Sequence, residues 1–218
     1  MQTQPAEIVR EYGPIAGIDC VNGLTYDGRR IWIAVGERLC AIDPASGDMD
    51  QSIEAPASSG TAFDGKHLYQ IGEGRIQKID RATGVVVATV PAPSTEDNSG
   101  MAWAEGYLWV GQYGGRKILQ VEPSTGAILR TIESDRFVTG VTWVEGELWH
   151  GGWEGDDAEI RRIDPKSGEV MHRLTLPEDI GVSGLESDGG DYFYCGGGSS
   201  KKVRVVHRPR QHVSSGAV

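Results

Sequence analysis

A segment of about 40 residues recurs five times along the chain, and this repeat constrains the fold more than any other feature. Each copy begins with a small polar residue and a glycine, passes an Asp-Gly or Glu-Gly pair or its equivalent, and contains an apolar-aromatic pair, as in NGLTYDGRRIWIAVG. Four copies continue into a second turn, as in RLCAIDPASGDM. The leading glycines are Gly23, Gly60, Gly100, Gly140 and Gly184. The repeat therefore organises almost the whole chain.

Within each copy, apolar and polar residues alternate with a period of two, which is the pattern of β-strands. The motif Asp-Pro-x-Ser-Gly, at residues 43–47 and 164–168, favours a hairpin turn because Asp accepts a backbone hydrogen bond, Pro fixes its φ and Gly adopts positive φ. Each copy is thus predicted to supply four strands, as a propeller blade does. The sequence predicts an all-β, five-bladed β-propeller in a single domain over residues 1–218, with blades starting near residues 23, 60, 100, 140 and 184.

The two ends of the chain complement each other. The fifth copy stops after three strands at KKVRVVH, whereas residues 6–14 form a strand-like segment before the first copy. This segment has the pattern of the outermost strand in the other copies. We expect residues 6–14 to complete the last blade, because that pairing covers two exposed strand edges. The tail at residues 211–218 is predicted to be loose.

The composition argues against several classes of function. No apolar run is long enough to span a membrane, and the 31 glycines are largely explained by the turns of the repeat. The formal net charge of −10 disfavours nucleic acid and membranes as partners and favours a polar or cationic small-molecule ligand. The three cysteines are too scattered for a disulfide framework. Because the first residues lack an apolar signal core, we expect a cytoplasmic protein, secreted only if a signal peptide has been removed. We also expect a monomer or a homodimer.

Two kinds of side chain recur at the same position in all five copies. Aromatic residues occupy the same place in the second strand of all five copies, and we interpret them as packing between blades: Trp32, Tyr69, Trp109, Trp149 and Tyr194. A small polar residue precedes each leading glycine, which predicts a polar collar at the channel mouth: Asn22, Ser59, Ser99, Thr139 and Ser183. The collar either satisfies backbone groups or positions a ligand.

Residues that break the repeat near this mouth are the candidates for a site. The loop HGGWEGDDAEI of the fourth copy departs most, and it contains His150, Trp153, Glu154 and Asp156. In one interpretation His150 is a catalytic acid or base, and Glu154 or Asp156 orients it or binds a divalent metal. In the other, the loop is a solvated acidic surface and the histidine packs between blades. No HxH or HxxxH pair is present, so no cofactor is certain and a divalent metal stays open.

Three further residues that break the repeat are predicted to lie at the same rim. They are Asn98, Tyr113 and Arg136, each in a loop next to the third or fourth copy. With Trp153 and the collar, these residues would bind a polar or cationic ligand that has a flat or apolar part. Solvated loop side chains explain the same pattern.

The fourth copy, VTGVTWVEGELWHGGWEGDDAEIRRIDPKSGEV, resembles the glutamine cyclotransferase family, whose members are five-bladed propellers. In that resemblance Trp153 falls on a tryptophan that lines the family's substrate pocket, and Thr139 falls on an asparagine. The family's catalytic glutamate falls on Ile33, Gln70 or Val110, so the resemblance does not carry over N-terminal glutamine cyclisation. The blades are also similar to those of streptogramin lyase-like propellers, which use histidine and an acid with a divalent metal.

Two functions are compatible with these residues. The first is a small-molecule enzyme of the lyase, cyclase or hydrolase type with its site at the channel mouth. The second is a non-catalytic propeller that binds a ligand or scaffolds a protein. Propellers host both, so the arrangement of the candidate residues has to discriminate between them.

Overall fold

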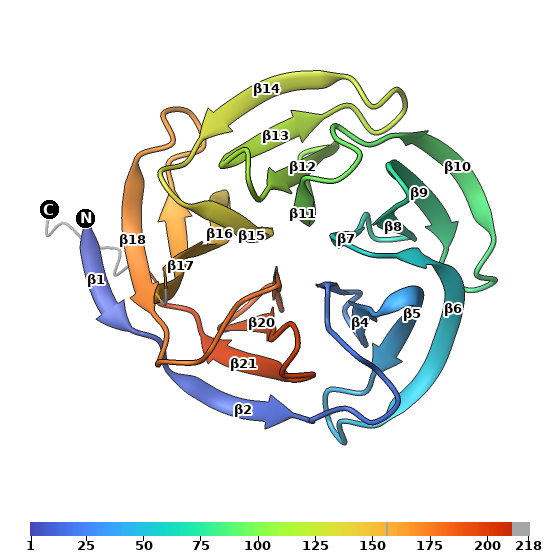
Figure 1. Ribbon diagram of the computed structural model, residues 1–218, viewed down its shortest axis with the longest axis horizontal. Helices are drawn as coiled ribbons and strands as arrows, with labels where there is room; N and C mark the ends of the chain where they lie inside the picture. Colours follow the sequence, from blue (N-terminus) through green and yellow to red (C-terminus); the bar gives the residue numbers. More distant parts are fainter. Residues whose placement is uncertain (156, 211–218) are drawn as a thin grey trace, which may run out of the picture.

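The computed structural model describes residues 1–155 and 157–210, and within these ranges the regular secondary structure consists of strands alone. Five sheets are arranged in a ring around a central axis (Figure 1). This confirms the predicted all-β, five-bladed propeller. The described residues include no helix that is long and apolar enough to cross a membrane.

The first four blades each contain four antiparallel strands that follow one another in chain order from the channel outward. The first blade contains β3 (Gly23–Tyr26), β4 (Ile31–Ala34), β5 (Gly36–Ile42) and β6 (Met49–Ala57). The second contains β7 (Thr61–Phe63), β8 (His67–Gly72), β9 (Arg75–Asp80) and β10 (Val86–Pro91). The third contains β11 (Asn98–Ala104), β12 (Tyr107–Gln112), β13 (Lys117–Val121) and β14 (Ile128–Glu133). The fourth contains β15 (Phe137–Val144), β16 (Glu147–Glu154), β17 (Asp157–Ile163) and β18 (Val170–Thr175).

The last blade is built from both ends of the chain. It contains β19 (Gly184–Ser187), β20 (Tyr192–Gly196), β21 (Val203–His207) and β2 (Ile8–Tyr12). The antiparallel pairing of β2 with β21 confirms that the N-terminal segment closes the ring. The predicted tail at 211–218 lies outside the described residues.

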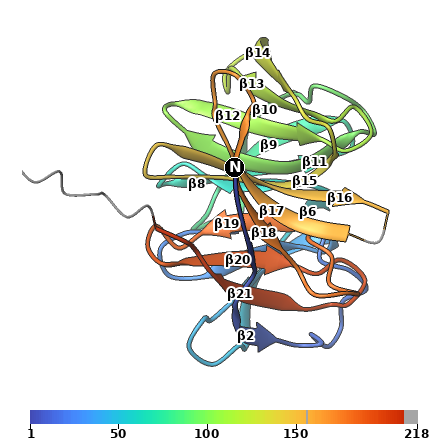
Figure 2. The ribbon, with the colours of Figure 1, turned by 90° about the vertical axis from the view of Figure 1, so that its left-hand side faces the viewer.

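A strand that the repeat does not predict lies at the very start of the chain. Residues Gln2–Pro5 form β1, which pairs in parallel with β18 and adds a fifth strand to the fourth blade. Figure 2 shows the chain passing from β1 beside β18 to β2. The N-terminal segment therefore joins the last two blades as well as closing the ring.

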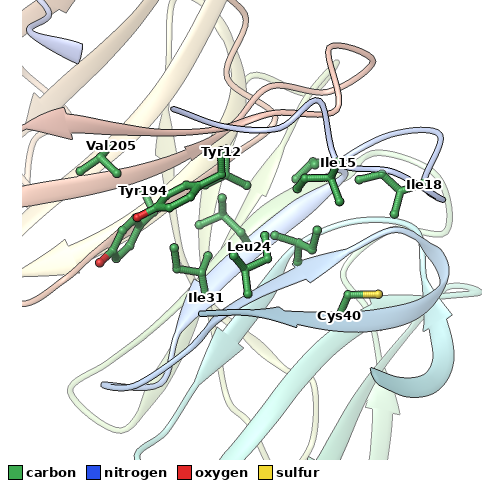
Figure 3. Close-up of a cluster of buried hydrophobic side chains, with 12 residues drawn as sticks. Tyr12, Ile15, Ile18, Leu24, Ile31, Cys40, Tyr194 and Val205 are labelled. Carbon is green, nitrogen blue, oxygen red and sulfur yellow. The ribbon is translucent and has the colours of Figure 1, made fainter. Parts of the chain in front are cut away.

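Large apolar side chains fill the spaces between blades, as the recurring aromatics predicted. Trp32, Trp109 and Trp149 are each 1% exposed. Where the last blade meets the first, Tyr12 and Tyr194 pack with Leu24 and other aliphatic side chains (Figure 3). Closure by the N-terminal strand thus also supplies part of the core.

The five leading glycines bring the innermost strands into backbone contact. A Cβ added at Gly100 would lie 2.5 Å from the Cα of Gly140, and one at Gly140 would lie 2.5 Å from the backbone nitrogen of Leu185. A Cβ at Gly23 would likewise lie 2.5 Å from the carbonyl oxygen of Ser59. These positions leave no room for a side chain, which explains why every copy has glycine directly after the collar residue.

Candidate functional site

A cavity of about 550 Å³ lies at the channel mouth, and we call it the mouth cavity. All five collar residues line it, together with Asn98, Tyr113 and Trp153 from the predicted set and with Glu96 and Asp179. The structure thus brings together eight of the nine residues expected to bind substrate. Arg136 is the ninth and does not line this cavity. The binding roles themselves stay predictions.

Three collar hydroxyls join one blade to the next. Ser59 Oγ donates to the carbonyl oxygen of Asn98 or Ser99, and Ser99 Oγ donates to that of Val138 at 2.7 Å. Ser183 Oγ donates in the same way to the carbonyl oxygen of Val21. These bonds match the interpretation in which the collar satisfies backbone groups.

Thr139 departs from this arrangement. Its side chain is 6% exposed, yet its Oγ1 has no hydrogen-bond partner among the described residues. The Oδ1 atom of Asn98 is also buried without such a partner, while its Nδ2 donates to the carbonyl oxygen of Ser94. Both oxygens are almost completely enclosed by protein atoms, so they are unpaired groups inside the cavity wall rather than groups open to the cavity.

Loss of a hydrogen-bonded collar hydroxyl and loss of an unpaired one should have different effects on stability. We expect Ser99→Ala to lower the free energy of unfolding by about 1 kcal/mol, because it leaves the Val138 carbonyl without its donor. Thr139→Val removes a hydroxyl that bonds to no described residue, so it should leave the stability unchanged or raise it. Urea unfolding of the two variants measures both effects. Equal destabilisation by both would contradict the distinction.

Two aromatic side chains project into the mouth cavity. Tyr113 is 42% exposed and Trp153 is 40% exposed, which is unusual for rings in this protein. Tyr113 is held in place because it stacks on Phe137 with ring centroids 4.6 Å apart. The guanidinium of Arg116 lies 4.4 Å from the centre of the Phe137 ring. The cavity therefore offers rigid aromatic faces to a ligand.

The charge around the mouth cavity is negative. Glu96 and Asp179 line it, and no lysine, arginine or histidine is among its described lining residues. The nearby Arg116 pairs with Glu154 at 3.0 Å, and Arg136 pairs with Glu159 at 3.0 Å. Neither cation is thus free to neutralise the cavity, which favours a cationic ligand.

The residues expected to be catalytic do not meet in the mouth cavity. His150 is 1% exposed, donates from Nδ1 to the Gly151 carbonyl at 2.9 Å, and lines a separate cavity of about 180 Å³ with Asp135 and Arg161. Burial lowers the pKa of His150 to about 4. Glu154 is held by Arg116, and Asp156 lies outside the described residues. The geometry corresponds to the interpretation in which His150 packs between blades, and a catalytic role for it stays a prediction.

Two carboxylates in the interior, one buried and one partly buried, were not singled out in the sequence. Glu159 is 3% exposed and forms ion pairs with three arginines, namely Arg136, Arg161 and Arg173. Glu186 lies on the innermost strand β19 and accepts hydrogen bonds from Thr25 Oγ1 at 2.7 Å, from Thr142 Oγ1 and from its neighbour's backbone nitrogen. Burial raises the pKa of Glu186 to about 7.

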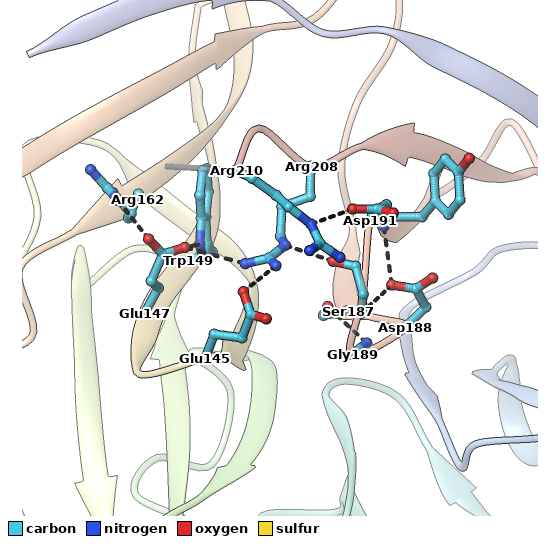
Figure 4. A network of polar contacts seen from close by, with 12 residues as sticks. Glu145, Glu147, Trp149, Arg162, Ser187, Asp188, Gly189, Asp191, Arg208 and Arg210 are labelled. Carbon is cyan, nitrogen blue, oxygen red and sulfur yellow. Dashed lines mark hydrogen bonds and ion pairs between the residues drawn. The ribbon is translucent and has the colours of Figure 1, made fainter. Parts of the chain in front are cut away.

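A further polar network anchors the end of the described chain. Arg208 is 1% exposed, and it pairs with Glu145 and Glu147 and donates to the Gly190 carbonyl (Figure 4). Glu147 also accepts hydrogen bonds from Trp149 Nε1 at 3.0 Å and from Arg162 at 2.5 Å. These groups bond to one another across the fourth and fifth blades, so the network joins the two blades.

No set of three or more histidine, cysteine or acidic side chains is placed to hold a metal ion within residues 1–155 and 157–210. The mouth cavity has two lining carboxylates and no histidine.

Comparison with solved structures identifies the same architecture in an enzyme. The chain is similar to the crystal structure of glutaminyl cyclase from Myxococcus xanthus, with a TM-score of 0.79 and 18% sequence identity over 94% of this chain and 97% of that one. The chain shares that enzyme's five-bladed fold. At this level of identity the likeness confirms the resemblance to glutamine cyclotransferase-like propellers in fold alone.

Two other structures are more distantly similar. A protein of unknown function from Bacteroides caccae matches with a TM-score of 0.59 and 16% identity over 87% of this chain and 74% of that one. Hydrazine synthase from Kuenenia stuttgartiensis matches with a TM-score of 0.53 and 15% identity over 82% of this chain and 56% of that one. No family model and no curated protein matches the sequence.

The positions that the resemblance aligns with a catalytic glutamate are all buried. Ile33 and Val110 belong to the apolar core. Gln70 is 0% exposed, accepts from Thr61 Oγ1 at 2.6 Å and donates to the backbone carbonyl of Ser59 at 3.1 Å. None of the three lines the mouth cavity.

Proposed function

We propose that this protein binds a small organic cation in the mouth cavity. The observation that carries the proposal is the composition of one cavity. It is lined by two exposed aromatic rings, Tyr113 and Trp153, and by two carboxylates, Glu96 and Asp179, with no basic side chain among the lining residues that the structure describes. Aromatic faces attract cations, and the acidic wall adds long-range attraction.

A matched pair of probes tests this proposal. Phenethylammonium and phenylacetate have the same ring and opposite charges, so isothermal titration calorimetry should detect one molecule of the cation per chain and no binding of the anion. We expect Glu96→Gln to weaken cation binding about fivefold, as loss of a partly exposed ion pair does. Trp153→Ala should weaken it about tenfold, because the cation loses an aromatic face.

Tyr192→Ala is the control for the tryptophan variant. Tyr192 is similarly exposed, at 38%, but it packs against His207 and does not line the mouth cavity. We expect this variant to bind phenethylammonium like the parent protein. The proposal fails if both ions bind equally, or if Tyr192→Ala and Trp153→Ala lose the same affinity.

A second candidate is an enzyme of the cyclase type that acts at the same cavity. The likeness to a glutaminyl cyclase favours it, and Glu96 and Asp179 are the cavity groups that would accept or donate a proton. The test is to incubate the protein with a peptide that begins with glutamine and follow release of ammonia. Turnover that is lost in Glu96→Gln or Asp179→Asn supports this candidate, and absence of turnover leaves cation binding as the function.

A further inference from the structure

A second cavity, of about 580 Å³, lies beside the mouth cavity, and we call it the side cavity. The two share Trp153, Asp179 and Gly181, so the tryptophan lies in the boundary between them. The Trp153 ring lies next to Gly181, where an added Cβ would be 3.4 Å from the ring, at ordinary van der Waals distance. A ligand that extends beyond the mouth cavity over Trp153 enters the side cavity.

The side cavity continues the acidic character of the mouth cavity. Asp157 and Glu178 line it in addition to the shared Asp179, and no basic side chain is among its described lining residues. With Glu96, the two cavities carry four exposed carboxylates, and none of them forms an ion pair with any residue of 1–155 or 157–210. Elsewhere in the protein many carboxylates are paired with arginine or lysine. These four carboxylates follow one path through the two adjoining cavities.

The chemistry differs between the ends and the middle of this path. At the mouth end, the exposed Glu96 lines the cavity together with the polar side chains of the collar. An ammonium group has N–H donors that pair with such a carboxylate. In the middle lies the exposed Trp153 ring, which suits a methylene chain. At the far end lie Asp157 and Glu178, which suit a second cation.

We propose that the two cavities together bind an elongated aliphatic diamine or polyamine, with one ammonium in each cavity and the methylene chain across Trp153. This inference rests on the proposed function and specifies its ligand class. A ligand with one charge fills the mouth cavity and leaves the side-cavity carboxylates without a counter-ion. A second ammonium, joined through the chain, is held by them at high effective concentration.

The test compares amines that differ in the number of charges. We expect isothermal titration calorimetry to show that spermidine binds at least about tenfold more tightly than n-butylamine at physiological salt. In the double variant Asp157→Asn with Glu178→Gln, n-butylamine should bind as in the parent protein, and the advantage of spermidine should fall to about twofold. Glu96→Gln should weaken both amines.

A charge-matched control separates the site from the general acidity of the chain. Glu105→Gln with Glu169→Gln removes two exposed charges that line neither cavity, and it should leave the advantage of spermidine intact. The inference is overturned if spermidine binds no more tightly than n-butylamine, or if the two double variants have the same effect. Those results leave the proposed function standing, whereas failure of n-butylamine to bind at all would overturn both.

Discussion

Gly100→Ala is expected to destabilise the protein by at least about 3 kcal/mol, which is a large share of the stability of a domain. The added methyl would lie 2.5 Å from the Cα of Gly140 in the next blade, and backbone atoms cannot turn aside as a flexible side chain does. The two innermost strands would have to separate, which weakens their packing around the channel. Urea unfolding followed by tryptophan fluorescence measures the loss.

Gly152→Ala provides the matched control. Gly152 is also a buried strand glycine, but a Cβ there would meet nothing nearer than 3.7 Å. We expect this variant to differ from the parent by less than about 1 kcal/mol. If Gly100→Ala were equally harmless, the close contact between innermost strands would not exist in solution.

Glu186→Gln is expected to stabilise the protein at pH 8 by on the order of 3 kcal/mol and to have little effect at pH 4. Burial raises the pKa of Glu186 from an ordinary value of 4.5 to about 7 in the folded state. The folded protein therefore binds this proton more tightly than the unfolded chain. In the parent, protonated Glu186 therefore contributes its full stabilisation below pH 4.5, and this contribution is lost as the pH rises through about 7.

The measurement is the free energy of unfolding as a function of pH for the parent and for Glu186→Gln. The parent should lose stability between pH 4.5 and 7 relative to the variant, and the difference should be constant above pH 8. Thr25→Val removes one donor to the carboxylate, so it should move the transition to higher pH. Parallel curves for the parent and Glu186→Gln over the whole range would contradict the raised pKa.

The repeat makes the fold and the collar predictable. Each copy repeats the small polar residue and the glycine, so Ser59, Ser99 and Ser183 have to occupy equivalent places around the axis, and they do. The parallel strand β1 was not predictable in this way. Its residues, Gln2–Pro5, carry no alternating pattern of apolar side chains, and they pair with β18 in a parallel ladder.

The catalytic set was harder to predict because neighbours in sequence do not share a face of a strand. His150 and Trp153 are three residues apart on β16, so their side chains point to opposite faces of the sheet. Trp153 reaches the mouth cavity, while His150 is buried beside Arg161. Residues 150–154 were expected to form a loop but belong to strand β16, and the two-residue period of that strand places His150 and Trp153 on opposite faces.

Glu186 lies on the innermost strand β19, whereas the candidate residues were sought in loops, although the sequence does mark it as unusual. The equivalent residues of the other innermost strands are Thr25, Ala62, Ala102 and Thr142, so one carboxylate stands among small side chains. Comparison of the five copies of the repeat therefore identifies this position as unusual. Its hydrogen bonds to two other blades require the three-dimensional arrangement.

Nuclear magnetic resonance of the six tryptophan indole N–H groups tests cation binding at the mouth cavity most directly. Trp153 lines the mouth cavity, whereas the other five tryptophans do not. Titration with phenethylammonium should shift the Trp153 signal to saturation, with the dissociation constant found by calorimetry, and leave the other five in place. A Trp153→Phe variant assigns the signal. A Trp153 resonance that stays unmoved while the cation binds would contradict the account.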